Sequence, residues 1–300
     1  MPSGPSAQDR MRAFSEPSLC SSCLVAASKP TATGRKVSLK IVVIGGTGRV
    51  GSKLVAKLTE HGHEAVPASP KLGINTITGE GLAKALDGAS VVVDVSDSPN
   101  FTYATALEFF ETSTRNLLAA DVAARVGHHV ALSIVGTKTL SEGGDPTRTT
   151  AGYFRAKLTQ EALIQASGIP YTIVHATQFY EFIKGIADGS THDGIVRVPP
   201  VLFQPMAADD VATAVVRVAI GAPVNGIVEI GGPERFRVDE VIRRVLALWH
   251  DPRKVVTDTN AGYYGIAVGE RTLVPGDGAS LGEIRLDDWL PQSVARTVAV

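Results

Sequence analysis

The sequence has few cysteines, no long apolar run and almost no net charge. Its 300 residues include only two cysteines and carry a formal net charge of −1. A near-neutral chain has no long-range attraction for nucleic acid or for an anionic membrane surface. No apolar run approaches the roughly 20 residues that a membrane helix needs, and there is no disulfide framework. These absences favour a cytoplasmic protein with neither a nucleic-acid nor a membrane partner.

The few candidate metal ligands are poorly placed. Cys20 and Cys23 form a C-x-x-C motif in a Ser-rich stretch, and His128 and His129 are adjacent to one another. A zinc site needs four ligands, and a thioredoxin-type redox pair needs a βαβ context. Neither requirement is met around these residues, so we predict no metal site.

The first 38 residues differ in composition from the rest of the chain. They are rich in Ser, Pro and Ala and have no periodic apolar face. Such a segment cannot bury enough surface to offset the entropy that ordering costs. We predict a disordered extension over residues 1–38. Its basic, acid-poor composition leaves an organelle transit peptide as the alternative, although no amphipathic Arg-rich helix is visible.

From residue 39 onward, short apolar stretches alternate with helical patterns. Apolar runs such as residues 39–44 are typical of parallel strands buried on both faces. The alternation predicts an α/β fold with a Rossmann-like, doubly wound parallel sheet. The expected strands are 39–44, 64–68, 90–95, 129–135 and 171–175, and the expected helices are 50–61, 82–86, 105–126 and 154–167.

The alternation loosens after residue 178. Helices are predicted at 210–220 and 239–249 and a strand at 226–230, with loops elsewhere. This part is too irregular for an independent domain. We therefore divide the folded chain into a Rossmann domain (39–178) and a small C-terminal substrate-binding lobe (179–300) at the sheet edge.

A glycine-rich turn joins the first predicted strand to the helix that follows it. Gly45, Gly48 and Gly51 have the spacing G-x-x-G-x-x-G. The first glycine permits the tight turn, the second lets a pyrophosphate approach, and the third lets helix and strand pack closely. The helix N-terminus then attracts the phosphates, which predicts NAD(P) binding. The other residues that we assign to this site are Thr47, Arg49 and Val50 in the turn and Val95 and Ser96 at the end of the strand 90–95.

The end of the second predicted strand bears on the choice of cofactor. An NAD site usually has a carboxylate there to bind the ribose 2′-hydroxyl. Here Ser69 and Lys71 occupy the region and no acidic residue does. Ser69 can donate a hydrogen bond to a 2′-phosphate and Lys71 can supply charge. The sequence favours NADP, with NAD as the alternative.

Tyr153 and Lys157 are four residues apart near the start of a predicted helix, so their side chains share one face. A neighbouring ammonium should lower the pKa of a phenol and make Tyr153 a usable acid or base. Lys157 can also bond to the nicotinamide ribose. Ser133, near the carboxyl end of the strand 129–135, is placed to orient a substrate carbonyl.

These motifs together resemble a known family. The glycine turn, residues 153–157 (YFRAK) and 167–174 (SGIPYTIV) resemble the atypical short-chain dehydrogenase/reductases. Residues 205–212 (PMAADDVA) are similar to a helix entry in their NmrA-like NAD(P)-binding branch. The resemblance covers about residues 39–250.

The resemblance implies roles for individual residues. It implies a Rossmann fold with the three glycines at the phosphates, Lys157 at the nicotinamide ribose, Ser133 as the oxyanion-orienting serine and Tyr153 as the general acid. NmrA-like proteins often lack that tyrosine, and some are redox-sensing regulators without turnover. This chain has the tyrosine, but it has His175 where the family pattern leads us to expect arginine.

We therefore expect an oxidoreductase that uses NADPH to reduce a small carbonyl, quinone or enone, with Tyr153 as acid/base. The alternative is a non-catalytic NADP(H) sensor that acts through a protein partner. A third hypothesis, an isomerase or epimerase, differs in that it produces no net oxidation of the cofactor.

Overall fold

The computed structural model describes residues 38–145 and 149–298. The described residues belong to one compact unit, Val37–Val300. Residues 1–37 of the predicted extension, with Cys20 and Cys23, lie outside the described residues.

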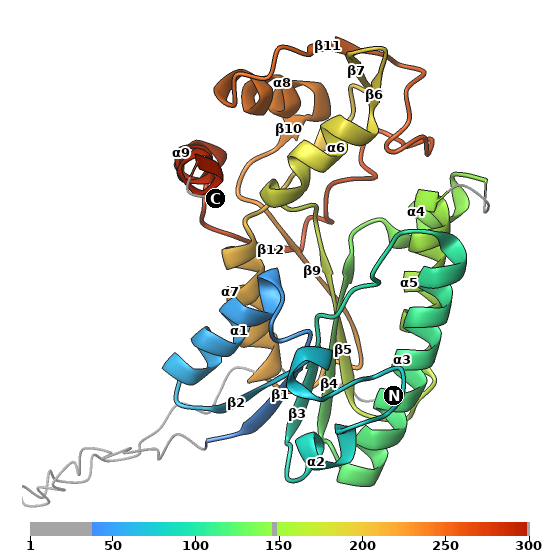
Figure 1. The fold of residues 1–300 in the computed structure, drawn as a ribbon, viewed down its shortest axis with the longest axis vertical. Coiled ribbons are helices and arrows are strands. Elements are labelled where there is room, and N and C mark those ends of the chain that lie inside the picture. The colour runs from blue at the N-terminus through green and yellow to red at the C-terminus, as the bar shows by residue number, and fades with distance from the viewer. Residues whose placement is uncertain (1–37, 146–148, 299–300) are drawn as a thin grey trace, which may run out of the picture. The chain divides into compact units, whose positions relative to one another are not determined.

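A seven-stranded parallel sheet forms the centre of this unit (Figure 1), in the order β12-β9-β5-β4-β3-β1-β2. The chain passes from β1 to β2 on one side and to β3 on the other, so the strand order reverses between β1 and β3. Doubly wound sheets bind ligands at such a switch point, outside the carboxyl ends of the strands. The predicted fold class is confirmed. The strands are β1 (Lys40–Ile44), β2 (Glu64–Ala68), β3 (Val91–Asp94), β4 (His128–Ile134), β5 (Tyr171–Ala176), β9 (Gly226–Gly231) and β12 (Ser280–Leu281).

Helices cover both faces of the sheet (Figure 1): α1 and α7 lie on one face, and α3 and α5 on the other. The side chains of β1 explain this layering, because successive residues of a strand point to opposite faces. Ile41 and Val43 pack with residues of α1 and α7, whereas Val42 and Ile44 pack with residues of α2 and α3. The helices of this region are α1 (Arg49–Glu60), α2 (Leu82–Leu86), α3 (Tyr103–Ala124), α4 (Thr137–Glu142), α5 (Thr149–Gln165) and α7 (Ala208–Ala219), with a short 3-10 helix η1 (Pro70–Leu72).

The C-terminal lobe has more regular structure than the sequence predicted. Its elements are η2 (Tyr180–Phe182), α6 (Ile183–Gly189), β6 (Thr191–His192), β7 (Ile195–Val198), β8 (Leu202–Phe203), β10 (Phe236–Arg237), α8 (Val238–Leu248), β11 (Lys254–Thr257) and α9 (Leu286–Val298). Our expectation of loops over most of these segments was wrong. Strands of two to four residues are too short to show an alternating pattern.

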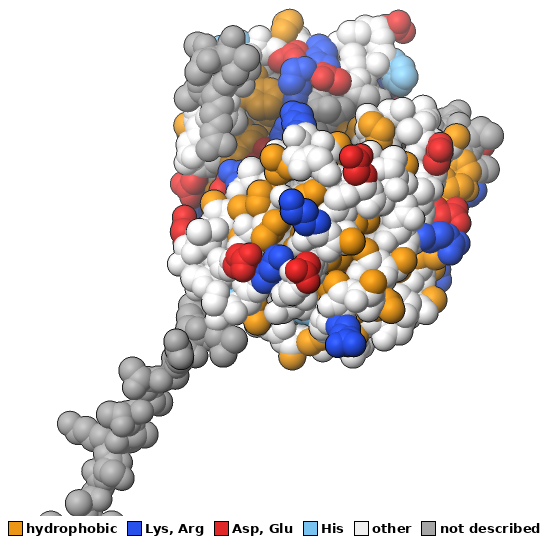
Figure 2. All heavy atoms as spheres, turned by 60° about the horizontal axis from the view of Figure 1, so that its bottom comes forward, with side chains coloured by type: hydrophobic (Ala, Val, Ile, Leu, Met, Phe, Trp, Pro, Cys, Tyr) orange, Lys and Arg blue, Asp and Glu red, His pale blue; other side chains and the backbone are white. Residues whose placement is uncertain are grey.

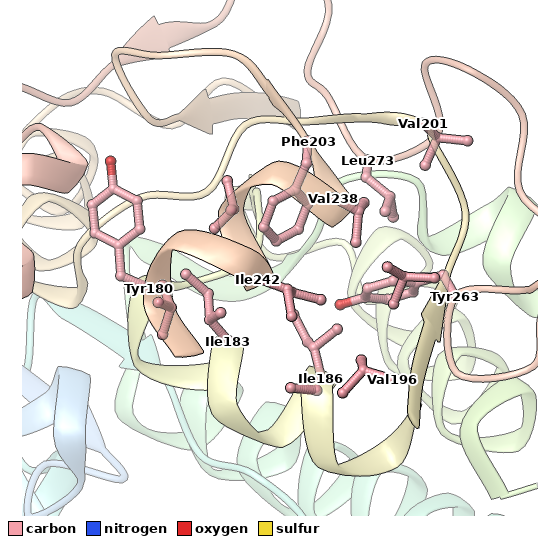
Figure 3. Close-up of a cluster of buried hydrophobic side chains, with 14 of the residues drawn as sticks. Tyr180, Ile183, Ile186, Val196, Val201, Phe203, Val238, Ile242, Tyr263 and Leu273 are labelled. Carbon is pink, nitrogen blue, oxygen red and sulfur yellow. The ribbon is translucent and has the colours of Figure 1, made fainter. Parts of the chain in front are cut away.

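One hydrophobic core joins the residues after 178 to the part of the chain that precedes them. Phe203, Ile242 and Leu273 meet in this core, with Tyr180 and Ile183 at one side (Figure 3). The same cluster includes Leu140 of α4 and Phe154 of α5. Shared burial of this kind ties the lobe to the helices beside the carboxyl ends of the strands.

The adjacent histidines lie inside β4 rather than before it. His129 is fully buried, and its Nδ1 lies 2.7 Å from Oδ2 of Asp121 on α3. His128 Nε2 lies 2.9 Å from Oγ1 of Thr172 on β5. Burial raises the pKa of the Asp121 carboxyl, and the nearby His129 opposes that shift. Within residues 38–145 and 149–298, no group of three or more potential ligands could hold a metal ion.

His128 should make stability depend on pH. Burial, followed by the neighbouring His129, lowers the pKa of His128 to about 4 from 6.5. The unfolded chain therefore binds the extra proton first, and stability should fall as pH drops from about 6.5 to about 4, by on the order of 2 kcal/mol. His128→Gln keeps a polar partner for Thr172 and should flatten this dependence in urea unfolding. The exposed His192, changed to Gln, is the control; equal pH slopes for the two variants would contradict the assignment.

Acidic and basic side chains are interspersed on the face shown in Figure 2, which agrees with the small net charge.

Among the described helices, none combines the length and apolar character that crossing a bilayer requires.

Candidate active site at the carboxyl ends of the strands

The glycine turn lies at the switch point between β1 and β3. Gly45 has a φ of +76°, and a Cβ atom there would lie 2.9 Å from the backbone of Ser96. A Cβ atom at Gly51 would lie 2.1 Å from the Gly45 carbonyl oxygen. The first and third glycines therefore have the roles that the motif predicts, since a side chain at either position would collide with backbone.

The start of α1 fits a phosphate group. Gly48 is the exposed N-cap residue, no side chain caps the helix, and its first turn contains no acidic residue. These features leave the positive end of the helix dipole open to an anion. Thr47 is exposed beside Gly48, whereas the Val50 side chain is buried in the core, so Val50 offers the cofactor its backbone alone.

Arg49 connects the turn with the C-terminal lobe. Its guanidinium lies 5.4 Å from the ring centre of Phe182, which stacks on Phe179. Arg49 Nη1 also donates to the carbonyl oxygen of Glu181 at 3.4 Å. The side chain therefore stays beside the phosphate position but contacts the segment that follows β5.

The two residues predicted to select the cofactor, which follow β2, differ in their exposure to solvent. Lys71 is exposed in η1, where a 2′-phosphate could reach it. Ser69 is buried, and its Oγ has no hydrogen-bond partner among the described residues. Lys71 is therefore the more exposed of the two candidate residues, whereas the Ser69 hydroxyl is buried without a partner in the described part of the chain.

The end of β3 carries a polar network that the sequence did not predict. Asp94 is buried, and its Oδ1 accepts hydrogen bonds from Ser96 Oγ at 2.6 Å and from the Ser96 backbone at 2.9 Å. Its Oδ2 accepts from Gln160 Nε2 at 3.0 Å. Val95 and Ser96, predicted to contact the cofactor, thus lie beside the glycine turn, and Asp94 fixes the Ser96 hydroxyl.

Tyr153 donates its hydroxyl hydrogen to Oδ1 of Asp97 at 3.0 Å. Burial and the negative charge of Asp97 raise the pKa of Tyr153 well above 10. Our expectation of a lowered pKa was wrong, because Lys157 does not outweigh these two effects. Partial removal of water also raises the pKa of the Asp97 carboxyl, although the residue as a whole stays exposed.

Lys157 is 3% exposed and points into the protein. Its ammonium donates to the Leu132 carbonyl oxygen at 2.8 Å and to Gln160 Oε1 at 2.5 Å, and it lies 4.6 Å from the Phe110 ring centre. Burial lowers the pKa of Lys157, while Asp94, Asp97 and Glu161 raise it. The lysine shares a helix face with Tyr153 as predicted, but its described partners are protein groups.

Ser133 is also buried, and its hydroxyl donates to Oε1 of Glu161. His175 Nε2 lies 3.1 Å from the same carboxylate oxygen. Ser133 and His175 are paired neighbours on β4 and β5, and Glu161 approaches both from α5. The hydroxyl predicted to orient a carbonyl is therefore engaged by a carboxylate.

The structure brings Tyr153, Lys157 and Ser133 to one region, and sequence reasoning missed their acidic partners. Glu161 lies four residues after Lys157, so helical spacing could have revealed it. Asp97 lies 56 residues before Tyr153 in the chain, and no local pattern links them.

Residues 72–220 match a family model described as NAD(P)H-binding, which begins after the glycine turn. The chain therefore contains a region similar to the NAD(P)H-binding family, within the Rossmann-type sheet described above. No curated protein matches the sequence.

Solved structures share the fold of this chain at low sequence identity. MoeE5, solved with UDP-glucose and NAD, is 18% identical over 87% of this chain and 99% of its own, with a TM-score of 0.63. UDP-glucose 4-epimerase from Thermus thermophilus, in complex with NAD, is 16% identical over 87% and 99%, at 0.62. A dTDP-4-dehydrorhamnose reductase from Clostridium acetobutylicum is 17% identical over 87% and 100%, at 0.62.

Proposed function

We propose that this protein is an NADPH-dependent reductase of a small carbonyl, quinone or enone, with Tyr153 as the proton donor. The observation that carries the proposal is the Tyr153–Asp97 pair. Of the three predicted catalytic residues, Ser133 and Lys157 are buried, whereas Tyr153 is partly exposed and bonded to an exposed carboxylate.

A bound nicotinamide supplies the hydride in such a reaction. The protein's part is to deliver a proton to the substrate oxygen as negative charge develops on it. Tyr153 holds its proton firmly, because its pKa is raised, so it enters the reaction as a neutral acid. Asp97 accepts the hydroxyl hydrogen and sets its direction until a substrate oxygen replaces the carboxylate. Tyr153 then regains a proton from water beside Asp97.

The direct test mixes the purified protein with NADPH and a panel of aldehydes, ketones, quinones and enones. Oxidation of NADPH that depends on one of these substrates supports the proposal. The epimerases among the structural neighbours give the competing isomerase hypothesis its support. Conversion of a nucleotide sugar without net change in the cofactor would favour that hypothesis and contradict ours.

A non-catalytic sensor of the NADP/NADPH balance is the second candidate function. It is favoured by the engagement of Lys157 and Ser133 with protein groups, which leaves neither free for a substrate. A partner protein that is released when NADP replaces NADPH, with no turnover of any carbonyl, would support the sensor.

Lys71 should decide between the two cofactors. It is exposed beside the end of β2, and no carboxylate in that turn would repel a 2′-phosphate. Lys71→Ala should weaken NADP binding by about tenfold and leave NAD binding unchanged, because only NADP carries the extra phosphate. Calorimetric titration of both cofactors measures this, with Lys84→Ala on α2 as the control. Equal affinity of the wild type for NADP and NAD would refute the NADP preference.

A further inference from the structure

A cleft separate from the candidate active site lies between two pairs of helices. The starts of α1 and α7 form one wall, and the end of α8 and the first half of α9 form the other. The volume of the cleft is about 560 Å³, which is in the range of sites for small organic molecules. None of Tyr153, Lys157 and Ser133 lines it, and of the residues predicted to bind the cofactor only Arg49 does.

Both tryptophans of the chain line this cleft. Trp249 follows α8, and its Nε1 donates to Ser293 Oγ at 3.3 Å. Trp289 lies in α9, and its ring centre is 5.3 Å from that of Tyr180. These contacts fix the positions of two large aromatic side chains at one cavity, where the half-buried Trp249 and the mostly buried Trp289 offer apolar area.

The cleft carries an excess of negative charge. Of its four carboxylates, Glu181 accepts hydrogen bonds from the backbone at the start of α7, and Asp209 forms a 2.8 Å ion pair with Lys53. Glu283 and Asp288, on the other wall, are exposed. Within the described part of the chain, neither side chain has an ion pair or a hydrogen bond. Two carboxylates in the described part of the chain therefore have no direct ionic partner beside the two indole rings.

Arg49 and Lys53 also line the cleft, so its six charged side chains carry a net charge of −2. The Arg49 guanidinium is held at the opposite wall by the Phe182 ring and the Glu181 carbonyl oxygen, and it keeps its positive charge there. Aromatic rings attract cations through their ring quadrupoles, and carboxylates attract them by charge, whereas both disfavour an anion.

We propose that this cleft is a ligand site, separate from the dinucleotide crevice, that binds an organic cation with a flat apolar body. The ring of the ligand lies against Trp249 and Trp289, and its ammonium faces Glu283 and Asp288. Because Arg49 is the first residue of α1, the site adjoins the phosphate position without including it.

The two tryptophans make the test direct, since all indole fluorescence of the protein comes from this cleft. The full chain is titrated with phenethylammonium, phenethyl alcohol and phenylacetate, which share a ring and differ in charge. Phenethylammonium should give a saturable fluorescence change. The alcohol should bind at least about tenfold more weakly, and phenylacetate should not bind. Equal affinities for the three probes would show an unselective apolar cleft and overturn the proposal.

Matched variants test the two carboxylates. Asp288→Asn and Glu283→Gln should each weaken phenethylammonium binding by roughly threefold to tenfold. Asp287→Asn is the control, because Asp287 is on the same helix but pairs with Arg244 instead of lining the cleft. These exposed substitutions should leave the folded state intact, which circular dichroism checks. Unchanged binding in both cleft variants would refute the role of the carboxylates.

A final titration with saturating NADP present distinguishes this site from the cofactor crevice. The phenethylammonium curve should persist under these conditions. Competitive displacement by NADP would place the probe in the cofactor site and reject a separate one.

Discussion

Tyr153→Phe is expected to lower kcat for NADPH-dependent carbonyl reduction by about 10²–10⁴-fold, which is the usual contribution of a positioned general acid. The substitution removes the hydroxyl that donates to Asp97 and keeps the ring, which packs edge-on against Phe101 and Phe110. Cofactor affinity and Tm should therefore remain near the wild-type values. Initial rates of NADPH oxidation, together with calorimetry for NADP, measure the two effects separately.

Two further variants make this result specific. Tyr171→Phe makes the same change at the start of β5, far from the carboxyl ends of the strands, and should have wild-type activity. Asp97→Asn keeps an acceptor for the Tyr153 hydroxyl but removes the charge, so a smaller loss of kcat is expected. Wild-type rates in Tyr153→Phe would exclude the tyrosine from the reaction and show that another group supplies the proton.

Gly51→Ala is expected to disrupt both the fold and the cofactor site. The added Cβ would lie 2.1 Å from the Gly45 oxygen and 2.8 Å from its carbonyl carbon, so α1 must move away from the turn. Overpacking of a well-packed region typically costs about 1–3 kcal/mol, and displacement of the helix N-terminus should weaken NADP binding by more than about tenfold. Thermal unfolding and calorimetric titration measure the two losses.

The other glycines provide the comparisons. Gly278→Ala should be neutral, because nothing lies within 4 Å of the added atom. In Gly48→Ala the new atom would be 3.1 Å from the Gly45 oxygen at an exposed N-cap. That variant should lose cofactor affinity with little loss of stability. A Gly51→Ala protein with wild-type Tm would contradict the close helix–turn contact.

Local patterns predicted six of the seven strands of the central sheet and most of its helices, but they missed β12 and α4. The apolar strands and the glycine turn can be recognised from a few consecutive residues. The strand β1 and the helix α1 therefore begin and end close to the predicted positions. The structure of the C-terminal part was harder to predict from the sequence. Strands such as β8 and β10 have only two residues, and only the tertiary fold brings them together.

In the candidate site, too, local features could be predicted from the sequence and long-range contacts could not. The four-residue spacing correctly placed Tyr153 and Lys157 on one face of α5, but it could not show what faces them. Asp94, Asp97 and Phe110 come from distant segments, and they determine that the ammonium is enclosed and the phenol keeps its proton. Residue spacing reports a shared surface, whereas burial and long-range partners determine the charge on it.

The strand β2 lies at one open edge of the central sheet, and its composition bears on self-association. The backbones of Glu64 and Ala68 bond to the β1 side, so Pro67, one residue before Ala68, turns its nitrogen outward. Proline has no N–H there to offer a strand from another molecule. At the opposite edge β12 has only two residues, Ser280 and Leu281. The proline at one edge and the shortness of the strand at the other both disfavour pairing with a strand of a second molecule.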